Sequence, residues 1–117
     1  MKAKALQNLR AAGLLFDRGL FDAAAGRYHY SLFQACVHAL ERRGATPGES
    51  RPGALRWGHP MVQGRAGEIR GRPEDERFFE RVRDLRERAD YNPEPVGRWD
   101  VESCRREVER FVLEATE

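Results

Sequence analysis

A single segment, residues 21–43, limits the folds open to this chain more than any other feature of the sequence. Drawn as a helix, it is covered over most of its circumference by apolar and small side chains: Ala23, Ala24, Ala25, Tyr28, Tyr30, Leu32, Phe33, Ala35, Cys36, Val37, Ala39 and Leu40. A helix that is apolar nearly all round must be buried on several sides, so we expect it at the centre of a helical bundle. Arg42, Arg43 and Gly44 predict its end, because cations suit the negative end of the helix dipole and glycine readily stops a helix.

Four further segments show the spacing of helices, with apolar residues three and four positions apart. The predicted helices span residues 3–18, residues 60–69, a segment from Glu74 to just before Pro93, and a segment from Asp100 onward. Gly19 is placed to end the first of them in the left-handed conformation. Asp100 is expected to be the N-cap of the last helix, with Trp99 packed on Cys104 one turn in.

The class predicted from these segments is all-α. Residues 44–59 are rich in glycine and proline and are expected to form a loop, and no alternating apolar–polar run bounded by turn residues predicts a strand. We therefore expect one domain, residues 1–117, folded as an antiparallel up-and-down bundle of four long helices and one short helix.

Composition excludes several classes of function. The 21 basic and 19 acidic residues leave a net charge of only +2, so any nucleic-acid site must be a local patch. Three scattered histidines lack the spacing of metal ligands, and no phosphate-loop or dinucleotide fingerprint occurs, so neither a metal nor a cofactor is expected. Cys36 and Cys104 are predicted to be small buried side chains, with a disulfide between them as the alternative. Without a signal peptide or a membrane-spanning stretch, a cytoplasmic location away from membranes is expected.

One stripe of the central helix is polar, at spacings of four, three, four and three: Arg27, Ser31, Gln34, His38 and Glu41. This spacing places all five side chains along one face. They could be the solvent-facing edge of a mostly buried helix. Alternatively, the first four could line a groove suited to a phosphate or a nucleobase, since they are mostly short hydrogen-bonding groups rather than Lys and Glu.

A second polar group lies near the end of the predicted fourth helix. Arg86 and Asp90 are spaced as an ion pair, but an exposed pair in this order contributes only about 0.3–0.5 kcal/mol, so they could equally stand at the mouth of a binding site. Tyr91 follows them, either facing a partner or plugging the end of the bundle. His29 is interpreted as a hydrogen-bonded core or dimer-interface histidine, and His59 as a cap of the short helix or its loop.

The order of these motifs resembles the HEPN family. The chain reads Arg27-Tyr28-His29-Tyr30-Ser31-Leu32-Phe33, then a Gly/Pro-rich loop before His59, then Arg86-Glu87-Arg88-Ala89-Asp90-Tyr91. HEPN proteins are similar in carrying a Tyr-Tyr-Ala-like stretch on the second helix and Ala-Asp-Tyr at the end of a later one. Here His29 separates the paired tyrosines, and Ser31 stands where alanine is usual.

The resemblance implies a helical bundle that often forms homodimers and is often encoded beside a minimal nucleotidyltransferase. Members of such pairs can be ribonuclease toxins, which the transferase neutralises by adding nucleotide to a tyrosine. Their ribonuclease signature is an arginine followed four to six residues later by a histidine. Arg86 matches the arginine, but this chain has no such pair, and Asp90 stands near the histidine position. Tyr91 lies close to the tyrosine position.

An aspartate is a poor substitute for that histidine. It ordinarily titrates near pH ~4, so at neutral pH it cannot give the proton of a general acid, and its charge repels phosphate. We therefore expect a non-catalytic module that binds nucleotide, RNA or a nucleotidyltransferase partner through the polar stripe together with Arg86, Asp90 and Tyr91. The alternative is a divergent metal-independent ribonuclease that uses Arg86 with His38 or His59.

Overall fold

The computed structural model describes the backbone of residues 1–51 and 54–117, and the side chains outside residues 49–55. Its elements are α1 (Lys2–Asp17), α2 (Phe21–Arg42), β1 (Gly48–Arg51), β2 (Ala54–Arg56), α3 (His59–Ile69), α4 (Asp75–Tyr91) and α5 (Arg98–Ala115). The all-α class is confirmed, and the helices begin and end within about two residues of the predicted positions.

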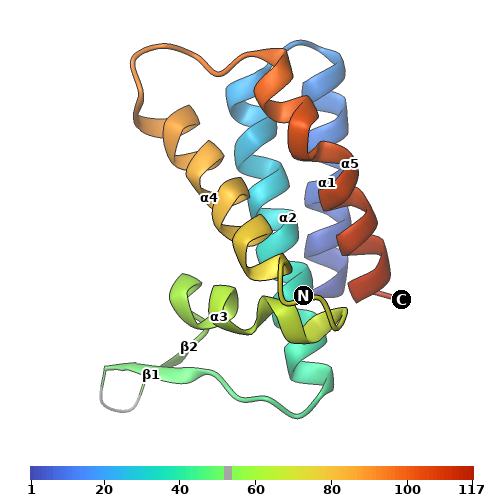
Figure 1. Ribbon diagram of the computed structural model, residues 1–117, viewed down its shortest axis with the longest axis vertical. Coiled ribbons are helices and arrows are strands. Elements are labelled where there is room, and N and C mark those ends of the chain that lie inside the picture. Colours follow the sequence, from blue (N-terminus) through green and yellow to red (C-terminus); the bar gives the residue numbers. More distant parts are fainter. Residues whose placement is uncertain (52–53) are drawn as a thin grey trace.

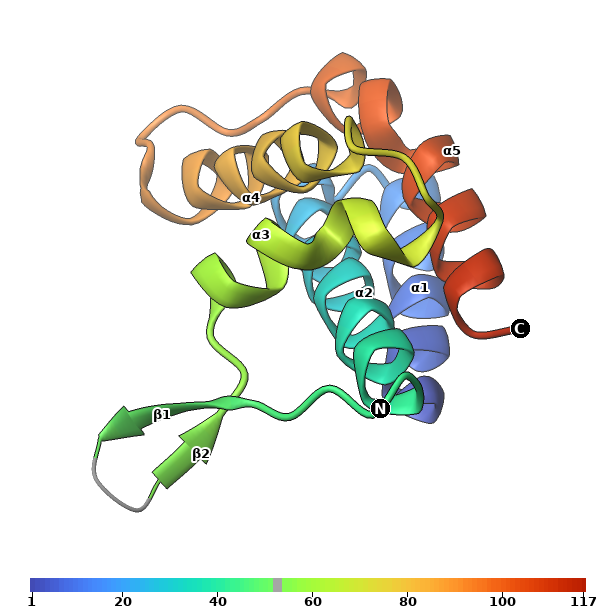
Figure 2. The same ribbon diagram turned by 60° about the horizontal axis from the view of Figure 1, so that its bottom comes forward.

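The four long helices run alternately up and down (Figure 1). Helix α2 lies in the middle and contacts each of the other four helices. The short helix α3 lies across one end of the bundle and packs on both α2 and α4 (Figure 2). In the part of the chain that the structure describes, no helix has the length and apolarity needed to cross a membrane.

The central position predicted for α2 is confirmed by burial. It carries eleven buried residues, more than any other helix: Ala24, Ala25, Tyr28, His29, Ser31, Leu32, Ala35, Cys36, Val37, Ala39 and Leu40. Cys36 and Cys104 are both buried and free, as expected of small apolar side chains. Burial raises the pKa of the Cys104 thiol to about 11, so this thiol is unreactive at neutral pH.

The helix ends follow the predicted turn chemistry at two positions and depart from it at one. Gly19 and Gly44 have φ of +75° and +82°, the left-handed conformation expected for glycine after a helix. The prediction that Asp100 is the N-cap of α5 is wrong. Gly97 is the N-cap, and the Asp100 carboxylate at the third helical position accepts the Gly97 N–H at 2.9 Å. Trp99 then falls inside the first turn, 84% exposed, and does not pack on Cys104.

The stretch predicted as a loop contains a short hairpin. Strands β1 and β2 pair antiparallel, with Gly48 opposite Arg56, and the register shifts between Glu49 and Arg51. The two strands have four and three residues, too few for an alternating pattern to be recognised. The hairpin projects from the end of the bundle where α3 lies (Figures 1 and 2). Helix α3 begins shortly after β2 ends.

Candidate functional site

The predicted ion pair on α4 is present, and a tyrosine from α2 joins it. Arg86 Nε lies 3.0 Å from Asp90 Oδ2, and Arg86 Nη2 donates to Tyr30 Oη at 3.2 Å. The guanidinium carbon of Arg86 also lies 5.5 Å from the centre of the Tyr30 ring. Contacts from two helices therefore orient a guanidinium whose side chain remains 20% exposed. Tyr30 was not predicted as a site residue, because its partner lies 56 positions away in the sequence.

Three rings form a continuous stack beside this cluster. The rings of Phe33 and His59 lie 4.5 Å apart, and those of His59 and His29 lie 4.9 Å apart at an angle of only 9°. The stack holds the start of α3 against α2, since His59 is the first residue of α3. The predicted capping role of His59 is wrong, because Gly58 is the N-cap and makes no side-chain cap.

Both histidines of the stack have lowered pKa values. Burial, together with the charges of His59, Arg86 and Arg83, lowers the pKa of His29 to about 3. Burial also lowers the pKa of His59, again with Arg83 and Arg86 contributing, while Glu87 acts in the opposite direction. At neutral pH both rings are therefore uncharged. His29 is fully buried, but among the described residues neither ring nitrogen has a hydrogen-bond partner, so the predicted hydrogen-bonded core histidine is only half right.

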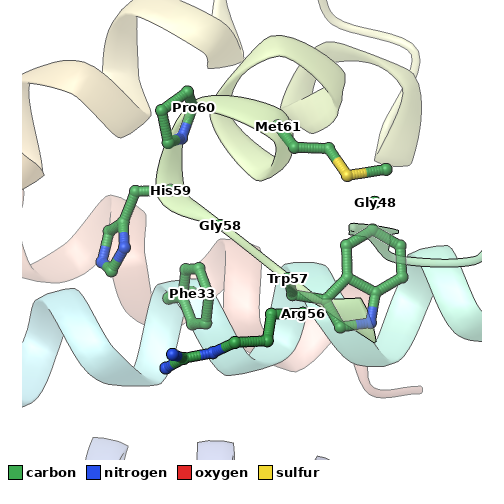
Figure 3. Close-up of a pocket in the computed structure, with 8 residues that line it drawn as sticks. All are labelled: Phe33, Gly48, Arg56, Trp57, Gly58, His59, Pro60 and Met61. Atoms are coloured by element: carbon green, nitrogen blue, oxygen red, sulfur yellow. The ribbon is translucent and has the colours of Figure 1, made fainter. Parts of the chain in front are cut away.

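A cavity of about 510 Å³ opens next to the stack, between the hairpin and α3. It is lined by Phe33, Gly48, Arg56, Trp57, Gly58, His59, Pro60 and Met61. Figure 3 shows Phe33 and His59 on one side of it, Trp57 and Met61 on the other, and the Arg56 side chain along its lower edge. Sequence reasoning missed this cavity, although an adjacent arginine and tryptophan within a Gly/Pro-rich stretch were the available signal.

The polar stripe of α2 does not form the predicted groove. The hydroxyl of Ser31, which is fully buried, donates to the Ala5 carbonyl oxygen at 2.7 Å. Arg27 donates to the Asn8 side-chain oxygen at 3.0 Å, and the Asn8 amide donates to Gln34 at 2.8 Å. The short hydrogen-bonding residues of the stripe therefore join α2 to α1, which explains why they are neither Lys nor Glu.

The remaining predicted residues lie apart from the stack. His38 has neighbours at the far end of α2, and its pKa is lowered by burial and then by Arg42, the N-terminus and Lys2. It stands eight residues, roughly 12 Å of helix, beyond Tyr30. Tyr91 is 77% exposed at the end of α4, so it does not plug the bundle. Among the described residues, no group of three or more His, Cys, Asp or Glu is arranged to hold a metal ion.

A second charged cluster is fully used within the protein. Arg70 makes two 2.9 Å hydrogen bonds to Asp75 and further bonds of 2.7 Å to Glu107 and 3.1 Å to Glu114. Its guanidinium also lies 4.7 Å from the centre of the Phe111 ring. The Arg70 side chain is only 5% exposed, so this cluster ties the end of α3 to α4 and α5 and is no binding site.

The model of the HEPN domain family matches residues 1–117, the whole chain. No curated protein and no solved structure matches it. Within this chain the match therefore covers the Arg86–Tyr30–Asp90 cluster, the ring stack and the cavity alike.

Proposed function

The chain belongs to the HEPN domain family, and we propose that it is a module that binds RNA or nucleotides without cleaving RNA. We further propose that it works with a nucleotidyltransferase in a toxin–antitoxin or defence-type pair. The observation that carries the proposal is the setting of Arg86, which is held by Tyr30 and Asp90.

The setting of Arg86 supports phosphate binding. A guanidinium presents five donors in a planar fork that matches phosphate. Here one donor bonds to Tyr30, and Nε lies 3.0 Å from Asp90 without forming a hydrogen bond, so other donors are left for a phosphate. Arg83 lies one turn earlier on α4 with its side chain 34% exposed, and its charge is partly offset by Glu87 at 3.4 Å. Because both contacts come from folded helices, little side-chain freedom is lost when a phosphate binds.

The same setting argues against cleavage. Cutting RNA without a metal requires one group that accepts a proton from the attacking hydroxyl and one that gives a proton to the leaving oxygen. The lowered pKa values of His29 and His59 leave both rings unprotonated at neutral pH, so neither supplies the second proton. The residue beside Arg86 on α4 is a carboxylate and not a histidine, so no imidazole stands there to accept one proton and give the other.

A second candidate function rests on His59. The charges of Arg83 and Arg86 lower the pKa of His59, so His59 lies close enough to feel them. A divergent ribonuclease that uses Arg86 with a histidine needs such proximity. His38 has no such neighbour among the groups that shift its pKa. RNA cleavage that resists chelators and disappears in both Arg86→Ala and His59→Ala would favour this candidate.

Fluorescence anisotropy with labelled single-stranded RNA tests the main proposal. We expect Arg86→Gln to weaken binding about tenfold, the loss of about 1.4 kcal/mol, because it removes a phosphate contact. Arg77→Gln is the matched control, since Arg77 is an exposed arginine in the first turns of the same helix. Equal affinities of the wild-type protein and Arg86→Gln would overturn the proposal.

The partner proposal is tested on Tyr91. We propose Tyr91 as the residue to which the transferase adds nucleotide, because its side chain is 77% exposed. Mass spectrometry after co-expression with a neighbouring nucleotidyltransferase should find the added mass on Tyr91 and not on Tyr28, which is 2% exposed. An unmodified Tyr91 in a pair that is active in cells would reject this role.

A further inference from the structure

We propose that the cavity between the hairpin and α3 is a nucleobase site, in which an unpaired base stacks on Phe33 and Trp57. The inference rests on the proposed function. Arg86 contacts the phosphate of the ligand, and the cavity holds its base. The occupant is a flat aromatic base that carries a phosphate, from either a free nucleotide or a single-stranded RNA.

The walls of the cavity suit a flat ring. Phe33 and His59 stand on one side and Trp57 and Met61 on the other (Figure 3), so both the aromatic faces and the polarisable sulfur point to a π-system. The volume of about 510 Å³ is typical of small-molecule sites and exceeds what a single side chain would fill.

The ring stack prepares this wall for a ligand. Phe33 ends the stack, and His59 is covered on one face by Phe33 at 4.5 Å and on the other by His29 at 4.9 Å. Phe33 is therefore held in place before any ligand arrives, and a base that stacks there loses only its own freedom. An aliphatic ligand would fill the same space but would gain nothing from the flat faces.

The charges around the cavity suit a phosphate attached to the base. Arg56 lines the cavity and is exposed, so it can contact a phosphate at the rim. His59 belongs both to the cavity wall and to the group of residues within electrostatic reach of Arg86. A strand whose base occupies the cavity therefore meets Arg56 at the rim, and Arg86 lies near the wall formed by His59, as expected where phosphates hold a strand and stacking holds its bases.

Tryptophan fluorescence tests the inference directly. The chain has two tryptophans, and Trp99 is 84% exposed on α5, so Trp99→Phe leaves Trp57 as the only reporter. In this background we expect saturable quenching by adenosine monophosphate and by a short adenylate RNA. Ribose 5-phosphate, which has the phosphate but no base, should not quench. The two active ligands distinguish a nucleotide site from an RNA site by their relative affinities.

Two substitutions sharpen the test. Phe33→Leu removes the flat face but retains an apolar side chain of similar size. We expect about tenfold weaker binding of the adenylate RNA, with a cooperative thermal melt that shows the variant is folded. Trp57→Leu, measured by anisotropy because the reporter is lost, should weaken the same RNA by a similar factor. Trp57 lies outside the helices, between β2 and α3, so this variant is the safeguard if Phe33→Leu unfolds.

The outcomes separate the two proposals. Arg86-dependent RNA binding without quenching of Trp57, or with full affinity in Trp57→Leu, would overturn the base site and leave the proposed function intact. Absence of RNA binding together with absence of quenching would overturn both. Quenching by adenosine monophosphate that Phe33→Leu weakens and ribose 5-phosphate does not reproduce would support the base site.

Discussion

At the scale of single residues, His29 is a buried histidine whose ring nitrogens have no hydrogen-bond partner among the described residues. It is fully buried, and its pKa falls to about 3 from an ordinary value near ~6.5. Below pH ~6.5, His29 is protonated in the unfolded chain but stays neutral in the folded protein. The free energy of unfolding therefore falls as the pH falls toward 3. The expected slope from this one residue is about 1.4 kcal/mol per pH unit.

Urea unfolding between pH 7 and pH 4.5 measures this slope. Carboxylates also contribute to acid unfolding, so the informative quantity is the difference between the wild-type protein and His29→Leu. We expect the variant to lose stability less steeply over this range. Parallel curves for the two proteins would show that His29 is not held neutral by burial.

Arg70 is the residue whose removal should cost the most stability. Its side chain is 5% exposed and bonds to Asp75, itself 3% exposed, so Arg70→Met leaves a buried carboxylate without its cation. We expect a loss of about 3 kcal/mol in the free energy of unfolding, measured by chemical denaturation. Arg65→Met, on the same helix but in an exposed pair with Glu68, should change little. A similar result for both variants would contradict the structural role of Arg70.

At the scale of elements, two glycines of α3 give opposite predictions. A Cβ on Gly67 would lie 3.0 Å from Pro73 Cα and 3.2 Å from the Arg72 carbonyl oxygen, so Gly67→Ala must displace backbone and should cost about 1–3 kcal/mol. A Cβ on Gly64 would meet nothing within 4 Å, so Gly64→Ala should stabilise by about 0.5–1 kcal/mol. Thermal melts of the two variants should shift in opposite directions, and a shift of the same sign would show that α3 packs differently.

Periodicity predicted the helices well, because each helix repeats its apolar residues along one face over several turns. The central position of α2 followed from its apolar circumference, and Gly19 and Gly44 ended helices as expected. The hairpin gave no comparable signal, because its strands are too short. Trp99 was misplaced because α5 begins earlier than its most obvious capping residue, Asp100.

The candidate site was harder to predict, because its parts come from separate segments. Arg86 and Asp90 share one helix, so their pairing followed from spacing alone. The contacts of Tyr30 with Arg86 and of Phe33 with His59 join residues far apart in the sequence, which spacing cannot reveal. The sequence left the polar stripe open between a solvent-facing edge and a groove. A hydrogen bond to a neighbouring helix, such as that of Ser31 to α1, leaves the same pattern in the sequence as a bond to a ligand.

At the scale of the whole molecule, we expect a homodimer. The family often dimerises, but the apolar surface of α2 is covered within one chain by the other helices, so a second chain must pack elsewhere. Large apolar side chains remain exposed on other helices and turns, among them Leu14, Leu20, Tyr91, Trp99 and Leu113. Light scattering at micromolar concentration should give twice the 13.5 kDa mass of one chain. A single species of 13.5 kDa would contradict the dimer.

The claim that the protein binds RNA without cutting it is tested most directly by following binding and cleavage together on one RNA strand labelled at both ends. We expect the isolated protein to raise the fluorescence anisotropy while energy transfer between the two labels survives. Arg86→Gln should need about tenfold more protein for the same anisotropy change. Sustained loss of energy transfer that resists a chelator and depends on Arg86 would contradict this claim, because the chain would then be a ribonuclease despite the carboxylate of Asp90 beside its arginine.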